Sequence, residues 1–198
     1  MTTIALFHSV LGVRPGVLAA ADQLNAAGHD VHVVDQYGGK VFDDYSEAGK
    51  FAEQIGYPGL MASAAEAVRE LPEQLVVIGF SNGGGMAEFV ATQRPVSGVV
   101  MLSGALPLEM LEVDAWPAGV PAQIHYALDD PHRKQEWIDA VATQVRAAGA
   151  RVQVFDYPGG GHLFTDSSLP REYDRRATEL LWSRVLPFCD AAAAAAGP

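Results

Sequence analysis

The sequence predicts an α/β fold with one mainly parallel sheet of about six strands and helices on both of its faces. Short apolar runs alternate with segments whose apolar residues recur at helical spacing, as in repeated β-α-β units. Several of the runs consist of branched residues without polar alternation, which is typical of strands buried on both faces. The length of 198 residues suits a single domain with a substantial core.

Composition limits the partners that the chain can have. The formal net charge is −11 at pH 7, which disfavours binding to nucleic acids or to anionic membranes. The one cysteine, Cys189, permits no internal disulfide, and we expect it to be buried in the last helix. The N-terminus shows neither the basic segment nor the cleavage site of a secretory leader, so we expect a cytoplasmic protein.

The first elements form a β-α-β unit. Residues 3–7 (TIALF) predict a strand, Pro15 opens a helix that Gly28 ends, and residues 31–34 predict the second strand. Residues 36–58 contain four glycines and show no clear period, so they predict an irregular excursion. Excursions that leave the C-terminal ends of strands commonly form the walls of a site in open α/β sheets.

The remaining chain continues the alternation. We expect strands over residues 74–78, 96–102, 122–128 and 151–156, and helices over residues 60–71, 82–93, 137–149 and 171–186. The segment 106–117 is expected to cover part of a cleft. Residues 1–190 then form one domain, and the alanine-rich residues 191–198 are expected to be a disordered tail.

The chemistry is expected around Ser81. Residues 79–83 (GFSNG) match the G-x-S-x-G pattern and follow four branched apolar residues, so they predict a strand, a sharp turn and a helix. Gly79 and Gly83 remove side chains that would collide with the neighbouring strand and helix. The Ser81 hydroxyl is then expected at a helix N-terminus, where developing negative charge is stabilised.

Two other roles for this glycine cluster were weighed. A glycine-rich turn can cradle a phosphate, but neither G-x-x-x-x-G-K-[ST] nor G-x-G-x-x-G can be written through residues 79–85. The run 83–85 can also serve close packing of the helix on the sheet, which is compatible with catalysis. A nucleophilic serine is therefore the favoured hypothesis.

A serine nucleophile needs a histidine base and a carboxylate that orients the histidine. His162 follows the glycine-rich loop after the last expected strand, and Asp129 and Asp130 follow the strand before it. The order serine, acid, histidine is that of α/β-hydrolases. Chain order alone leaves the choice between Asp129 and Asp130 open. His8 ends the first strand and is expected to be a wall residue.

Five segments carry a family resemblance: residues 8–12 (HSVLG), 33–37 (VVDQY), 79–84 (GFSNGG), 125–130 (HYALDD) and 157–164 (YPGGGHLF). In this order they resemble the dienelactone hydrolase family of α/β-hydrolases over nearly the full chain. The resemblance implies the α/β-hydrolase fold, and it selects Asp130, five residues after the position of His125. It also implies an oxyanion hole formed by the backbone N–H groups of Asn82 and Val10.

The resemblance includes two departures. Family members that open dienelactones carry a cysteine at the position of Ser81 and a glutamate at that of Ser9. We therefore expect a serine hydrolase without metal or cofactor that cleaves a small-molecule ester, thioester or lactone through an acyl-enzyme. The alternatives are a non-catalytic module of the same fold that binds a small molecule, and a dienelactone hydrolase with serine in place of cysteine. The expected pocket residues are His8, Ser9, Leu11 and Phe80.

Overall fold

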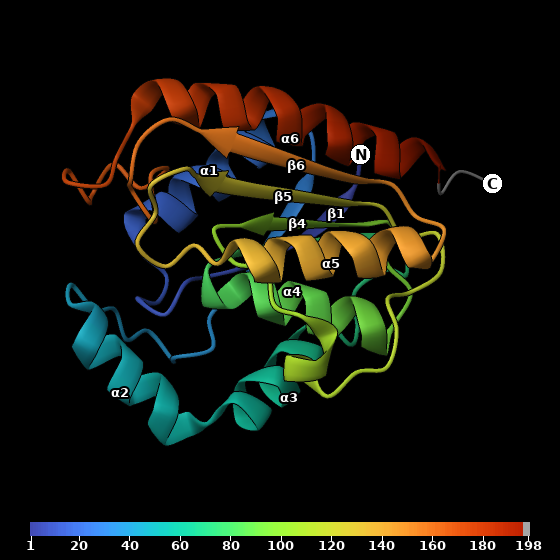
Figure 1. Ribbon diagram of the computed structural model, residues 1–198, viewed down its shortest axis with the longest axis horizontal. Coiled ribbons are helices and arrows are strands. Elements are labelled where there is room, and N and C mark those ends of the chain that lie inside the picture. Colours follow the sequence, from blue (N-terminus) through green and yellow to red (C-terminus); the bar gives the residue numbers. More distant parts are fainter. Residues whose placement is uncertain (196–198) are drawn as a thin grey trace.

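Six strands form one sheet in the computed structural model, which describes residues 1–195 (Figure 1). The order across the sheet is β2-β1-β3-β4-β5-β6, and each neighbouring pair is parallel. The strands are β1 (Thr3–Phe7), β2 (Asp30–Val34), β3 (Leu75–Phe80), β4 (Gly98–Leu102), β5 (Ala122–Ala127) and β6 (Val152–Tyr157). Every residue of β3, β4 and β5 is buried, as their branched sequences predict. The predicted fold class is confirmed.

Helices cover both faces of this sheet. They are α1 (Pro15–Ala26), α2 (Tyr45–Ile55), α3 (Tyr57–Ala67), α4 (Asn82–Gln93), α5 (Gln135–Ala147) and α6 (Arg175–Ala195). Helices α1 and α6 pack on one face, and α3, α4 and α5 pack on the other (Figure 1). Each face therefore has its own hydrophobic cluster. No helix in the described part of the chain combines the length and the hydropathy needed to cross a membrane.

Residues 36–58 are more regular than the sequence pattern predicts, because they contain α2 and the start of α3. Asp44 begins α2, and its side chain accepts a hydrogen bond from the Glu47 N–H at 2.9 Å. Gly56, with φ of 80°, separates the two helices. Only Ala48 of α2 is fully buried, but Tyr45, Phe51 and Ala52 recur at helical spacing and pack against the hydrophobic clusters. This spacing, and an acidic N-cap residue with glutamate three residues later, are the signals that could have predicted the helix.

The last helix also differs from its predicted bounds. The Asp174 carboxylate accepts a hydrogen bond from the Ala177 N–H at 2.9 Å, so α6 begins near residue 175 instead of 171. The helix continues over residues 191–195, where the sequence predicts a disordered tail. Alanine has the highest helix propensity, and Ala192 is buried against the sheet. Residues 196–198 lie outside the described residues. Cys189 is buried in α6, as expected.

Glycines let backbones meet at the end of β3. A Cβ atom on Gly79 would collide with the carbonyl of Gly83, and one on Gly83 would collide with the carbonyls of Phe7 and His8. These obstacles are backbone atoms and cannot move away as a flexible side chain can. The first turn of α4 is therefore locked between β3 and the end of β1.

We predict that Gly79→Ala lowers the free energy of unfolding by about 2–3 kcal/mol, because the added methyl group overpacks rigid backbone. Gly49→Ala in α2 is the control, since a Cβ there meets no atom within 4 Å. The control is expected to raise stability by about 0.5–1 kcal/mol through helix propensity. Urea unfolding measures both variants, and equal stabilities would contradict the proposed packing.

Candidate active site

Ser81, His162 and Asp130 meet at the C-terminal edge of the sheet. Ser81 lies between β3 and α4, Asp130 follows β5, and His162 follows β6. His162 Nε2 is 2.7 Å from Ser81 Oγ, and His162 Nδ1 is 2.7 Å from Asp130 Oδ2. Parallel strands end at the same edge, so loops that are far apart in the sequence deliver these groups to one place.

The backbone of Ser81 is strained. Its φ of 50° and ψ of −117° lie in a region that non-glycine residues rarely adopt. The Ser81 N–H donates a hydrogen bond to the Leu102 carbonyl at 2.7 Å. A side chain at Gly104 would collide with the Ser81 carbonyl, so the loop after β4 presses directly on the turn. These contacts hold the serine in its unusual conformation.

The structure separates the two candidate aspartates. Asp130 is 5% exposed, and its second oxygen, Oδ1, accepts a hydrogen bond from the His132 N–H at 2.8 Å. Asp129 is exposed, and its N–H is bound to the Gly159 carbonyl at 3.0 Å. The side chain that meets His162 is therefore that of Asp130.

Glu172 supports the loop that carries His162. Its Oε2 accepts a hydrogen bond from the Leu163 N–H at 2.7 Å, directly after the histidine. The hydroxyl of Tyr45 donates to the same carboxylate at 3.0 Å, and the Tyr45 ring lies 6.0 Å from the His162 ring. Burial and the neighbouring Glu172 raise the pKa of Tyr45, so this phenol stays protonated. One carboxylate thus fixes both the histidine loop and the start of α2.

The two residues expected to form an oxyanion hole, Asn82 and Val10, both line the cleft beside Ser81. Asn82 is the first residue of α4, so its N–H has no partner within the helix. Val10 belongs to the loop after β1. Within residues 1–195, neither N–H donates a hydrogen bond to another protein group.

A cleft of about 330 Å³ opens beside Ser81. Its walls include residues that the sequence pattern did not single out, since they come from α2, α3, β5 and α5. The lining residues are Val10, Tyr45, Gly49, Ala52, Glu53, Tyr57, Ser81, Asn82, Ser103, Gly104, Ala105, Leu106, Tyr126, His132, Trp137 and His162. Of the segment 106–117, expected to cover the cleft, only Leu106 takes part.

The four expected pocket residues, His8, Ser9, Leu11 and Phe80, are absent from this lining and are buried. His8 shows the reason: its Nδ1 is 2.6 Å from the Ser9 carbonyl, and its Nε2 accepts a hydrogen bond from the Gln36 N–H at 3.1 Å. Burial lowers the pKa of His8, which keeps the ring neutral. This ring connects the end of β1 to the chain after β2.

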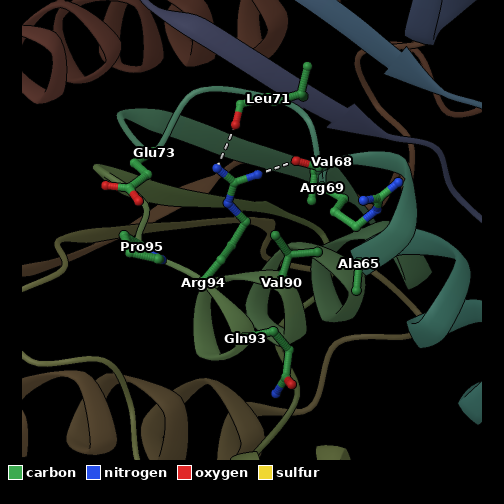
Figure 2. A pocket seen from close by; sticks show the side chains of 9 residues that line it. All are labelled: Ala65, Val68, Arg69, Leu71, Glu73, Val90, Gln93, Arg94 and Pro95. Carbon is green, nitrogen blue, oxygen red and sulfur yellow. Dashed lines mark hydrogen bonds between the residues drawn. The ribbon is translucent and has the colours of Figure 1, made fainter.

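A second hollow, of about 430 Å³, lies away from this site between the C-terminal ends of α3 and α4. Figure 2 shows the Arg94 guanidinium directed at the carbonyls of Val68 and Leu71, to which it is hydrogen-bonded. The guanidinium is thus engaged by the backbone, and neither a serine nor a histidine lines this hollow. The hydrogen-bonded pair of Ser81 and His162 lines the smaller cleft.

The parallel sheet, the G-x-S-x-G turn and the serine at its tip define the α/β-hydrolase class. Within that class, the family model described as "Dienelactone hydrolase family" matches residues 1–192. The chain belongs to the dienelactone hydrolase family.

Individual relatives are more distant. A protein of Saccharolobus solfataricus named "Putative carboxymethylenebutenolidase" is 29% identical over 119 residues, which are 59% of this chain and 44% of that protein. The match thus spans less than half of the relative's length. A dienelactone hydrolase-like promiscuous phosphotriesterase from metagenomic libraries has a TM-score of 0.77 at 19% identity, over 96% of this chain and 86% of the other. The Bacillus cereus carboxylesterase has a TM-score of 0.59 at 16% identity, over 96% and 88%. These structures share the fold.

A buried acid holds the loop after β4. Glu88 in α4 is fully buried, and its Oε2 accepts a hydrogen bond from the Leu106 N–H at 2.9 Å. The neighbouring Ala105 N–H donates to the Tyr126 hydroxyl at 3.0 Å. Burial raises the pKa of Glu88 well above its ordinary value, and the Leu106 N–H opposes this only in part. Glu88 is therefore favoured in its neutral form.

We predict that Glu88→Gln removes the part of the loss in the free energy of unfolding with rising pH that is due to Glu88. Glutamate ionises in the unfolded chain above about pH 4.3, whereas the buried carboxyl keeps its proton to higher pH. The wild type therefore loses about 1.4 kcal/mol of stability per pH unit from Glu88 as pH rises through this window. Urea unfolding from pH 5 to pH 8 should show the variant gaining on the wild type, and parallel pH profiles would contradict the assignment.

Proposed function

We propose that the protein is a serine hydrolase that cleaves a carboxylic ester, thioester or lactone through an acyl-enzyme. The observation that carries this proposal is the continuous chain from Ser81 to His162 to Asp130, with 2.7 Å at each link, beside an open cleft. Membership of the dienelactone hydrolase family supports chemistry at an ester bond. A pure binding module would have no use for a strained serine hydrogen-bonded to a histidine.

The first half of the reaction follows from the hydrogen bonds. With its proton on Nδ1, His162 donates to Asp130 and accepts the hydroxyl proton of Ser81 at Nε2. Ser81 Oγ then attacks the substrate carbonyl carbon, and the carbonyl oxygen becomes an oxyanion. Collapse of this intermediate breaks the bond to the alcohol or thiol, which leaves with the proton returned by His162.

Water completes the cycle. His162 takes a proton from a water molecule, whose oxygen attacks the acyl carbon. The bond between the acyl carbon and Ser81 Oγ then breaks, and His162 returns the proton to Oγ as the carboxylic acid leaves. The N–H groups of Asn82 and Val10 would bind the oxyanion in both halves, and such donors contribute about 3 kcal/mol each. Asp130 would stabilise the imidazolium that forms in each half. None of these steps requires a metal or a cofactor.

The substrate is a small molecule in this proposal, because the cleft of about 330 Å³ is closed by helices on two sides. The substrate can also be a lactone, and the protein would then be a dienelactone hydrolase with serine in place of cysteine. We propose that the reaction takes place in the cytoplasm, with which the free, buried thiol of Cys189 is compatible.

We predict that a fluorophosphonate adds one phosphonyl group to the wild type, at Ser81. Ser81→Ala should show no adduct, and His162→Ala should react at least about 100-fold more slowly, because the base is lost. Ser103→Ala is the matched control, since Ser103 also lines the cleft, and it should keep the adduct. Intact mass and peptide mapping measure the outcome. Labelling of Ser81→Ala, or an unlabelled folded wild type, would contradict the proposal.

We predict that Asp130→Asn lowers kcat by about 10³–10⁴-fold with little change in KM, because the amide no longer fixes the productive histidine tautomer. Asp129→Asn makes the same chemical change one residue earlier and should stay within about twofold of the wild type. Steady-state kinetics on 4-nitrophenyl acetate compares them. A loss that is as large in Asp129→Asn would refute the assignment of Asp130.

A further inference from the structure

The walls of the cleft are largely apolar and aromatic. Tyr45 from α2, Tyr57 from α3, Tyr126 from β5 and Trp137 from α5 surround the space beside Ser81. Small residues fill the gaps between them, so the rings form much of the surface that a substrate contacts. The small residues are Gly49, Ala52, Gly104 and Ala105.

Two of the tyrosine hydroxyls are already engaged. The Tyr45 hydroxyl donates to Glu172, and the Tyr126 hydroxyl accepts from the Ala105 N–H. Burial raises the pKa of both phenols, so neither becomes a charged group that could orient a substrate. These two rings therefore act as apolar walls.

The cleft offers little positive charge. Among the described residues that line it, none is a lysine or an arginine. Arg14 and Arg133, from neighbouring segments, are paired with aspartates at 2.7 Å, and the Lys134 ammonium lies 3.9 Å from the centre of the Trp137 ring. Lys134 keeps its charge in this contact but does not line the cleft, so a substrate carboxylate would find no cationic side chain in the lining itself.

Negative charge is present instead. Glu53, on α2, lines the exposed side of the cleft, and no described residue forms an ion pair or hydrogen bond with its carboxylate. The net charge of −11 adds a long-range field of the same sign. Both effects oppose the approach of an anion.

We propose that the cleft selects uncharged apolar esters and rejects esters and lactones that carry a carboxylate, with Glu53 as a residue that excludes the anion. The inference rests on the proposed function and narrows its substrate class. The apolar walls stabilise the uncharged part of the ester through burial, and they offer nothing that replaces the water around a carboxylate.

The test compares esters that differ in charge and little else. Methyl 4-acetoxybenzoate and 4-acetoxybenzoate form one pair, and 4-nitrophenyl valerate and mono-4-nitrophenyl glutarate form the other. We expect kcat/KM to be at least about tenfold higher for the uncharged member of each pair. All assays are run at one pH and one ionic strength, so that the substrate carboxylate is the only charge that differs within a pair.

Variants of α2 test whether Glu53 causes the preference for the uncharged ester. Glu53→Lys should reduce the ratio within each pair at least about threefold, mainly by raising kcat/KM for the carboxylate ester, and Glu53→Gln should fall between it and the wild type. Glu47→Lys is the matched control, because it makes the same charge change on the same helix outside the lining. It should keep the wild-type ratio within about twofold.

These outcomes can be told apart from those that test the proposed function. The inference is overturned if the carboxylate ester is hydrolysed as well as its uncharged partner, or if Glu53→Lys leaves the ratio unchanged. The hydrolase proposal still holds in both cases if the fluorophosphonate labels Ser81. Phenylboronic and 4-carboxyphenylboronic acid repeat the comparison as inhibitors of fluorophosphonate labelling, so the result does not depend on finding a good ester. Equal inhibition by the two boronic acids also overturns the inference. An unlabelled Ser81 contradicts the proposed function itself.

Discussion

Close contact between backbones at Ser81 is the constraint on which the rest of the site depends. Three segments meet there: the end of β1, the first turn of α4 and the loop after β4. They come this close because glycines occupy the contact positions, among them Gly79, Gly83 and Gly104. The contact holds Ser81 in a strained conformation that it would not keep alone. The packing of the core thus supplies the free energy that keeps Ser81 in this conformation.

Two carboxyl side chains extend this rigidity from the turn to the loops around it. The buried Glu88 accepts from the Leu106 N–H after β4, and the partly buried Glu172 accepts from the Leu163 N–H after β6. Loops have no ladder of their own to satisfy backbone donors, so a carboxyl side chain can take the place of a neighbouring strand. An unpaired buried N–H would cost about 1–3 kcal/mol, and the loop would shift to regain a partner. Each acid therefore determines where a part of the cleft lies.

The fold separates the reacting groups from the walls that would choose the substrate. Ser81, Asp130 and His162 follow strands of the sheet, whereas Tyr45 and Glu53 belong to α2, which lies beyond the strand ends in Figure 1. The start of helix α2 is held to the segment between β6 and α6 by the hydrogen bond from Tyr45 to Glu172, and most of the residues of α2 are exposed. Substitutions on this helix can therefore change the walls while the core keeps the reacting groups in place.

The sequence by itself determined the elements whose signal is local. Branched runs marked the buried strands, residues 79–83 marked the turn, and chain order marked the groups that meet at Ser81. Tertiary structure decided the rest. Chain order could not rank Asp129 against Asp130, and the family resemblance selected Asp130. The tertiary structure supplies the physical reason, since the Asp130 side chain is buried and Asp129 is exposed. The sequence indicated that the segment 36–58 forms walls of the site, and part of that segment lines the cleft, but which side chains face the cleft was decided only by folding. A cleft is formed by side chains from elements that meet only in the tertiary structure.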